Sequence, residues 1–340
     1  MPYIAPDVFS GSFDGNNYSI SNIELNEAGL FGNLQQATIK NIKLLSATLH
    51  LGENKVDMGI IANGSANSII ENTHIYEADI YGINSNKNYI GGFLGCAANT
   101  TINAVSMLRA NDLYEIENFG GIVGNLIENS SINAAVATGK MDYSNNLGGI
   151  ASHVDKTSSI SNAHTEFSLL YPKQSAGIAA TLEGRVEYCY ATGCAYGELE
   201  EGVDHPHEYK AIVYTNNEGI VANCAEGNTA TNKADFEALG FAYGSTNEAP
   251  WCGDGLPVLY FENAMQSTPV IGIDNNTIRY DGCCIECFNA QSITLYNMQG
   301  VVVNTANGNK LNVTSMAPGI YIAVATNEQG YISTRKIVKK

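Results

Sequence analysis

The sequence predicts an all-β protein, a parallel β-helix (β-solenoid) followed by a small antiparallel β-sandwich of the immunoglobulin-like type. Three observations predict this fold. A glycine phrase recurs about every 30 residues, a second phrase follows it at a near-constant distance, and residues 271–340 replace both with short strands and turns. We expect a solenoid over residues 1–262 with a cap over about 227–262, a linker over 263–270, and the sandwich over 271–340.

The first phrase is a small residue, in most copies glycine, followed by two apolar residues. Its copies are Gly29-Leu30-Phe31, Gly59-Ile60-Ile61, Gly92-Phe93-Leu94, Gly121-Ile122-Val123, Gly149-Ile150-Ala151, Gly177-Ile178-Ala179 and the weaker Ala211-Ile212-Val213. No segment holds a 3.6-residue period, and each glycine inside a helix would cost about 1 kcal/mol relative to alanine. Each repeat is therefore predicted to be one coil of short strands, with the right-handed winding that is commoner for such coils.

The second phrase follows the first by 9 to 11 residues. Its copies are Ile39-Lys40-Asn41, Ile70-Glu71-Asn72, Ile102-Asn103-Ala104, Ile132-Asn133-Ala134, Ile160-Ser161-Asn162, Val186-Glu187-Tyr188 and Val221-Ala222-Asn223. We expect the aliphatic residues of both phrases to point inward and to stack about 4.8 Å apart. The glycines are expected at corners that need positive φ or close backbone approach. The asparagines either form an amide ladder or merely tolerate turn geometry.

The ends of a solenoid must be covered. The segment from Phe9 to Ile23 resembles an opening coil in which aromatic residues replace small aliphatic ones. Residues 232–240 predict a short helix with Asn232 as its N-cap, and this helix together with Trp251 is expected to plug the last coil. Glu198 to Glu208 reads as a polar insertion between two coils.

The charge balance excludes some partners. The formal net charge is −17, so the chain should repel nucleic acid and anionic membrane surfaces, and neither is expected as a partner. No apolar run reaches the roughly 18–20 residues of a membrane helix, which predicts no membrane insertion. Residues Met1 to Pro6 contain neither a basic segment nor an apolar stretch, so we expect an export signal to be absent and the chain to be a processed or trimmed form.

A polysaccharide-degrading β-helix would need convergent carboxylates on neighbouring coils. Glu71 and Glu187 share one repeat position, but the copies between them carry Asn103, Asn133 and Ser161. No acidic ladder forms. We therefore predict no catalytic or cofactor-binding residues, no cofactor and no enzymatic activity.

Two groups of residues resemble metal ligands without matching a standard site. The insertion contains Glu198, Glu200, Glu201, Asp204, His205, His207 and Glu208, and its spacing fits no standard metal loop, so a solvated loop is expected. Cys283, Cys284 and Cys287 would need a fourth ligand to hold zinc, and strand thiols or a disulfide are expected instead. Of the other cysteines only Cys189 and Cys194 are close in sequence, and buried free thiols are expected.

The repeats resemble the GLUG-motif repeats of secreted bacterial proteins. Phe13-Asp14-Gly15-Asn16 and Gly29-Leu30-Phe31-Gly32 carry this resemblance, which extends from Phe9 to about Val221. The resemblance implies a large surface or adhesin-like protein. It assigns no chemistry to any residue.

The C-terminal segment is similar to the sorting domains of the Bacteroidetes type IX (Por) secretion system. The matching stretches are Leu295–Val303, Met316–Tyr321 and Arg335–Lys340. This resemblance implies export across the outer membrane, with the secretion machinery as partner, and attachment at the cell surface. It marks Gly319, Tyr321, Lys336, Lys339 and Lys340 as sorting-signal candidates. Cys283, Cys284 and Cys287 depart from the apolar strand usual there.

These observations predict a secreted or cell-surface, adhesin-like binding protein. The coil faces are rich in Asn, Ser, Thr and Tyr, and we expect them to contact glycans or host proteins. Tyr143, Tyr171 and Tyr196 are the candidate contact residues. Two alternatives stay open: an extracellular polysaccharide lyase or hydrolase built on a β-helix, and an inert surface spacer.

Overall fold

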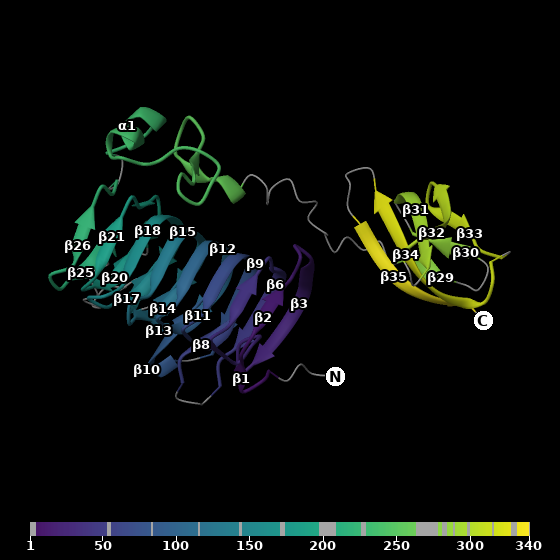
Figure 1. Cartoon of the computed structure of the whole chain (residues 1–340), viewed down its shortest axis with the longest axis horizontal. Helices are drawn as coiled ribbons and strands as arrows, with labels where there is room; N and C mark the ends of the chain where they lie inside the picture. The colour runs from purple at the N-terminus through teal and green to yellow at the C-terminus, as the bar shows by residue number, and fades with distance from the viewer. Residues whose placement is uncertain are drawn as a thin grey trace. The chain divides into compact units, whose positions relative to one another are not determined.

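The computed structural model describes residues 5–52, 56–82, 84–114, 116–142, 145–170, 174–196, 209–225, 229–262, 278–280, 284–287, 290–297, 300–314, 316–327 and 332–339. The chain divides into two compact units, Met1–Phe261 and Glu262–Lys340. The first is a parallel β-solenoid and the second consists of antiparallel strands, so the predicted fold class is confirmed (Figure 1). No helix in these residues is long and apolar enough to span a membrane.

Three parallel sheets run along the solenoid, and each coil contributes strands to them. Sheet A contains, in spatial order, β1 (Val8–Phe9), β4 (Asn33–Gln35), β8 (Ala62–Ala66), β11 (Leu94–Ala98), β14 (Val123–Ile127), β17 (Ala151–Val154), β20 (Ala179–Leu182) and β25 (Val213–Asn216). Sheet C contains β24 (Tyr209–Lys210), β19 (Ser175–Ala176), β16 (Asn146–Gly148), β13 (Ile116–Gly120), β10 (Asn84–Gly91) and β7 (Met58–Gly59).

Sheet B is the largest sheet. Its main path is β2 (Ser12–Asp14), β5 (Thr38–Lys40), β9 (Ile69–Tyr81), β12 (Thr101–Tyr114), β15 (Ser131–Asp142), β18 (Ser159–Leu170), β21 (Arg185–Glu187) and β26 (Ile220–Ala222). β3 (Ser19–Asn26) pairs with β6 (Lys43–His50), which pairs with β9, while β22 (Tyr190–Ala191) and β23 (Cys194–Tyr196) pair with β18.

The aliphatic residues of the first phrase form one continuous file through the solenoid. The backbone N–H of Phe93 donates to the carbonyl of Ile122 at 2.9 Å, Ile122 donates to Ile150 at 2.9 Å, and Ile150 donates to Ile178 at 3.0 Å. All four side chains are completely buried in the core. Since each buried aliphatic side chain contributes roughly 1.5–3 kcal/mol, this file is a principal source of stability.

Close backbone approach, rather than positive φ, explains the phrase glycines. A Cβ added at Gly121 would lie 2.0 Å from the carbonyl oxygen of Gly149, and one at Gly149 would lie 2.0 Å from that of Gly177. Neither glycine has the left-handed φ that would itself demand glycine. The coils stack so tightly at this corner that any side chain would collide with the next coil.

Positive φ occurs instead at the third residue of the second phrase. Every copy has it, at Asn41, Asn72, Ala104, Ala134, Asn162, Tyr188 and Asn223, with φ between 44° and 57°. Asparagine tolerates this conformation better than other residues with a Cβ, because its short polar side chain can hydrogen-bond locally. The corner geometry therefore explains why asparagine recurs there.

The asparagines also form an amide ladder, so both readings of the pattern hold. Asn72 Nδ2 donates to Asn41 Oδ1 at 2.7 Å. Farther along, Asn133 Nδ2 donates to Asn103 Oδ1 at 2.9 Å, and Asn162 Nδ2 donates to Asn133 Oδ1 at 2.8 Å. In this second part the ladder uses the middle residue of the phrase where alanine occupies the third.

Residues 229–261, which we call the strap, follow the last coil. The strap contains α1 (Lys233–Ala238), β27 (Trp251–Cys252) and β28 (Val258–Leu259), the two strands being antiparallel. The predicted helix is present, and the side chain of Asn232 accepts hydrogen bonds from the backbone N–H of Ala234 and Asp235, as an N-cap should.

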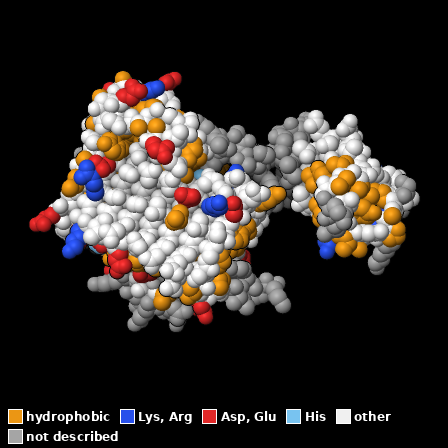
Figure 2. Space-filling model, in the orientation of Figure 1, with side chains coloured by type: hydrophobic (Ala, Val, Ile, Leu, Met, Phe, Trp, Pro, Cys, Tyr) orange, Lys and Arg blue, Asp and Glu red, His pale blue; other side chains and the backbone are white. Residues whose placement is uncertain are grey.

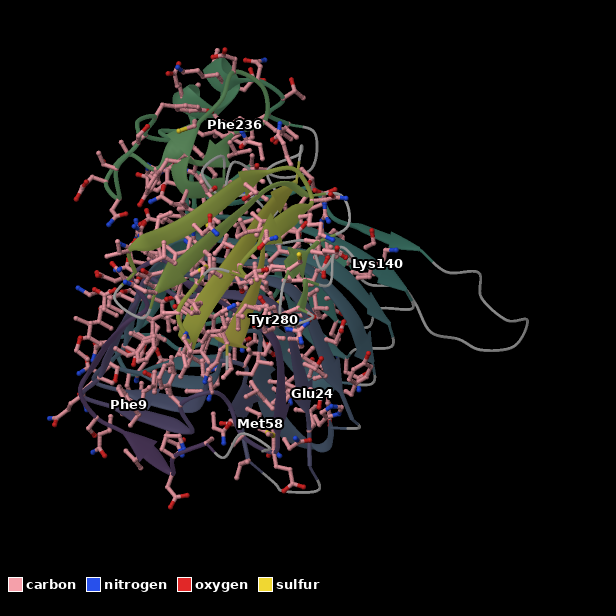
Figure 3. All side chains as sticks on the ribbon, turned by 90° about the vertical axis from the view of Figure 1, so that its right-hand side faces the viewer. Phe9, Glu24, Met58, Lys140, Phe236 and Tyr280 are labelled. Carbon is pink, nitrogen blue, oxygen red and sulfur yellow. The ribbon has the colours of Figure 1, made fainter. Side chains whose placement is uncertain are left out.

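The structure places the strap differently from the expected plug of the last coil. Trp251 Nε1 donates to Asn162 Oδ1 at 3.0 Å, and the ring of Phe261 lies 5.2 Å from that of His74, so the strap returns along the outer face of sheet B. Phe236 is buried there (Figure 3), whereas Ile220 at the end of the solenoid stays 51% exposed. On this face Val136 of β15 is completely buried, and β28 of the strap packs against β15.

The second unit contains two antiparallel sheets. One is β29 (Arg279–Tyr280), β30 (Cys284–Glu286) and β33 (Lys310–Asn312), and the other is β32 (Val302–Asn307), β31 (Ala290–Asn297), β34 (Gly319–Asn327) and β35 (Ile332–Lys339). Ile285 and Leu311 from the first share a core with Ile293 and Ala323 from the second. This arrangement is the predicted antiparallel sandwich.

Candidate functional site

A cluster of polar side chains lies on the outer face of sheet A, near the turn that joins sheet C to sheet A. We call it the corner cluster, and it consists of Tyr89, Cys96, Asn125, His153 and Glu183. Strand alternation turns Cys96, Asn125 and His153 outward, and the three occupy the same register position on β11, β14 and β17. Repetition of the coil therefore builds the cluster.

Glycine allows the backbones of the two sheets to approach closely beside this cluster. A Cβ added at Gly95 would lie 2.2 Å from the backbone nitrogen of Met58 in β7, and one at Gly124 would lie 2.7 Å from the Cβ of Tyr89 in β10. This approach leaves the side chains of Tyr89 and Cys96 only partly exposed.

The imidazole of His153 is held from both sides. Its Nδ1 is hydrogen-bonded to Asn125 Oδ1 at 2.8 Å, and its Nε2 lies 3.6 Å from Glu183 Oε1. The Tyr89 ring lies 6.3 Å from the imidazole, and the Tyr89 backbone N–H donates to the carboxylate of Asp57 at 2.8 Å. The cluster thus presents hydrogen-bond donors and acceptors in a fixed arrangement, which suits recognition of a polar ligand.

The electrostatics of the cluster do not activate its cysteine. Burial, followed by the carboxylates of Asp57 and Glu128, raises the pKa of Cys96 to about 11, so the thiol stays protonated near neutral pH. Asn125 lies between Cys96 and His153 in the sheet, which separates their strands by about 10 Å. A nucleophile and its base need hydrogen-bond contact, and these two residues are too far apart for it.

The corner cluster was not predicted from the sequence. Its signal is positional, because Cys96, Asn125 and His153 each lie four residues after a phrase glycine, Gly92, Gly121 or Gly149. The three differ in chemical type, so a search for recurring acids does not find them.

Four of the sorting-signal candidates lie on two paired strands of the second unit. Gly319 pairs with Lys339, and Ile322, next to Tyr321, pairs with Lys336. The hydroxyl of Tyr321 donates to the carbonyl of Ala317 at 2.9 Å. Lys339 Nζ donates to the carbonyls of Val313 at 2.7 Å and Thr314 at 3.2 Å, whereas the Lys336 side chain is exposed. Lys340 lies outside the described residues, and the role of all five stays a prediction.

Several other predicted residues fall outside what the structure describes. These are Tyr143, Tyr171, the side chain of Tyr196, the insertion from Glu198 to Glu208, and Cys283. Cys284 lies on β30, and Cys287 is buried, which raises the pKa of its thiol. Within the described ranges no group of three or more His, Cys, Asp and Glu side chains is placed to hold a metal ion.

Comparison with known proteins resolves the C-terminal segment. Residues 273–340 match the family described as the secretion system C-terminal sorting domain. This segment is a type IX sorting domain. The protein is therefore secreted, to the extracellular space or the cell surface, and its sorting domain interacts with the secretion machinery. The predictions of localisation and of this partner are confirmed.

A second comparison concerns enzymatic activity. Over 128 residues the chain is 33% identical to the immunoglobulin A1 protease of Streptococcus pneumoniae serotype 4 (strain ATCC BAA-334 / TIGR4), and the match covers 35% of this chain and 6% of that protein. The match is longer than the sorting domain, so it includes part of the solenoid unit. A solved structure of an IgA1 protease aligns with 96% of this chain and 30% of its own, at 16% identity and a TM-score of 0.47.

The sequence match contradicts the expectation that the chain is not an enzyme, because the relative that it identifies is named a protease. The expectation rested on the absence of an acidic ladder, which is a criterion for polysaccharide-degrading enzymes and does not address peptide cleavage. The chain spans only a small part of the curated relative. The resemblance of the repeats to GLUG motifs stays a prediction.

Proposed function

We propose that the solenoid is the recognition module of a secreted protein and that it binds a host glycoprotein through the corner cluster. The observation that carries this proposal is the in-register file of Cys96, Asn125 and His153, with His153 fixed between Asn125 and Glu183. Side chains on paired strands keep their spacing, so a ligand that binds them orders few protein groups and little conformational entropy is lost.

The chemistry of the cluster favours a hydroxyl-rich or amide-rich ligand. An amide, an imidazole and a phenol recognise sugar hydroxyls and peptide groups, and a chain with a net charge of −17 disfavours polyanions. The named substrate of the relative, immunoglobulin A1, makes an immunoglobulin the first partner to test. Glycans and other host surface proteins are the further candidates.

The test measures binding of the full chain to immobilised immunoglobulin A1, before and after enzymatic deglycosylation, and to a glycan array. We expect Asn125→Ala and His153→Ala to weaken binding at least about tenfold, because each removes a hydrogen-bonding group from a polar contact. The matched control is Lys140→Ala, since Lys140 is exposed on sheet B (Figure 3). Equal binding by all variants would rule out the corner cluster, and no binding to any ligand would favour the spacer alternative.

Proteolysis is the second candidate function, and the sequence match to a protease favours it. The full chain is incubated with immunoglobulin A1, and new fragments are sought by mass spectrometry with inhibitors of each protease class. Because the Cys96 thiol is kept protonated and lies away from His153, we expect any cleavage to persist in Cys96→Ser. Loss of cleavage in that variant would show that the corner cluster itself performs the reaction.

A further inference from the structure

Two cysteines that are distant in sequence meet in the last two coils of the solenoid. β21 pairs with β26 so that Val186 lies beside Val221 and Glu187 beside Ala222. Beyond this ladder, the backbone N–H of Ala225 donates to the carbonyl of Cys189 at 3.0 Å. The same register places Cys189 beside Cys224.

Both sulfur atoms face the interior. Cys189 is completely buried in the solenoid core, and Cys224 packs against that core while staying partly exposed. The Cys189 thiol donates to the carbonyl of Glu187 at 3.1 Å, and the Cys224 thiol donates to the carbonyl of Ala222 at 3.3 Å. Neighbouring strands lie about 4.8 Å apart, which falls within the range of about 4.4–6.8 Å that separates the Cα atoms of disulfide-linked cysteines.

We propose that Cys189 and Cys224 are a disulfide site that fastens the last coil of the solenoid to the coil before it after the protein leaves the cytoplasm. The sorting domain shows that the chain is exported, and disulfides form and persist in the compartments outside the cytoplasm. The last coil has a neighbouring coil on only one side, and Ile220 and Val221 at its edge are exposed. A disulfide between Cys189 and Cys224 would therefore hold the coil that has the fewest packing contacts.

The oxidant is a thiol–disulfide oxidoreductase in its disulfide form. The neighbouring Cys189 side chain lowers the pKa of Cys224, which is also the more accessible thiol, so the Cys224 thiolate attacks the oxidoreductase disulfide and forms a mixed disulfide. The Cys189 thiol then gives its proton to the leaving thiolate and attacks Cys224 Sγ. Two electrons pass to the oxidoreductase, which leaves as a dithiol carrying the two protons.

The first experiment locates the bond. The full chain is produced in an oxidising bacterial periplasm, alkylated under denaturing but non-reducing conditions, digested and analysed by mass spectrometry. We expect one cross-linked peptide that joins Cys189 to Cys224. Alkylation of both residues, or a bond from either one to another cysteine such as Cys194 or Cys252, would overturn the proposal.

The second experiment measures what the bond does. A bond between Cys189 and Cys224 closes the loop of chain between them and so restricts the unfolded chain. Dithiothreitol removes this restriction, and we expect it to lower the melting temperature of the wild-type protein by roughly 5–10 °C. Cys224→Ser should melt at the reduced wild-type temperature whether or not reductant is present. The matched control Cys96→Ser should keep the full response to dithiothreitol, since Cys96 lies on sheet A. A wild-type melting temperature that dithiothreitol leaves unchanged would contradict the fastening role.

Discussion

The two units treat their apolar side chains differently. In the solenoid the aliphatic residues of the second phrase are buried in every coil that has a neighbour on both sides. At the two ends of this file lie Phe13, which pairs with Ile39, and Val221, and each of these side chains is 37% exposed. In the sorting domain Val302, Ile320 and Val338 are exposed within a four-stranded sheet, and Figure 2 shows hydrophobic side chains gathered on one face of that unit. In the solenoid, the stacking of one coil on the next buries these side chains, whereas several apolar side chains of the sorting domain remain exposed to solvent.

The difference implies that the two units depend on different residues. The solenoid depends on tight contact between successive coils, so one side chain that does not fit should disturb the stacking of its neighbours. The sorting domain has a small core and an exposed sheet, so many of its surface residues should tolerate substitution while they remain open to the machinery that recognises them.

The largest expected effect comes from filling the glycine corner. Gly121→Val places a side chain where a Cβ would lie 2.0 Å from the carbonyl of Gly149 and 2.8 Å from the Cβ of Ala137. We expect a loss of more than about 4 kcal/mol in unfolding free energy, or failure to fold, because both neighbours are fixed backbone or core. Urea denaturation followed by circular dichroism measures the unfolding free energy. The control is Gly255→Ala, whose Cβ would meet nothing within 4 Å, and equal midpoints for both would contradict the stacking.

The next effect concerns a buried histidine under the strap. Burial, followed by the charge of Lys43, lowers the pKa of His74 to about 3 from its usual 6.5. The unfolded chain therefore takes up the proton first, and stability is full above pH 6.5 and falls as the pH drops toward 3. We expect a loss of about 2 kcal/mol between pH 7 and pH 5 from this residue alone.

Thermal melts of wild type and His74→Gln across pH 5–7.5 test this dependence. The variant removes the titrating group, so its stability should vary less with pH. His50→Gln on β6 is the matched control, and its stability is measured over the same pH range. If the stability of His74→Gln varied with pH as much as that of the wild type, protonation of His74 would not be the cause of the pH dependence.

Much of the solenoid was predictable because its signals repeat. Ile122 and Ile150 follow a glycine in successive coils, and a recurring position indicates a recurring environment. The contacts of Trp251 were not predictable, since Asn162 lies 89 residues earlier in the chain. Cys189 and Cys194 are close in sequence, but the register of the coils places Cys189 beside Cys224 instead.

The candidate site was less predictable than the fold for a related reason. The corner cluster mixes a thiol, an amide and an imidazole at one register position, so it has no shared chemical type to search for. The prediction that the chain is not an enzyme was contradicted because it applied a criterion for one class of reaction to all classes. A repeat fixes where a side chain points, whereas its chemistry varies freely from coil to coil.

A smaller effect is expected where the strap meets the asparagine ladder. Trp251 is the only tryptophan of the chain, and its indole donates to Asn162. Asn162→Ala leaves this buried donor unpaired, so we expect a loss of about 1–3 kcal/mol and a red shift of the tryptophan emission as the strap loosens. Asn125→Ala on sheet A is the control and should leave the emission unchanged. Unchanged emission in Asn162→Ala would mean that ring packing alone holds the strap.

The smallest effect separates two lysines of the sorting domain. Lys339 donates to the carbonyls of Val313 and Thr314, whereas Lys336 is exposed on the same strand. We expect Lys339→Ala to lower the unfolding free energy by about 0.5–1.5 kcal/mol and Lys336→Ala to change it by less than about 0.5 kcal/mol. Export of both variants is then measured in a host with a type IX system. If only Lys339→Ala reduces export, the secretion machinery recognises the folded shape of the sorting domain. If Lys336→Ala reduces export equally, the machinery recognises the exposed strand itself.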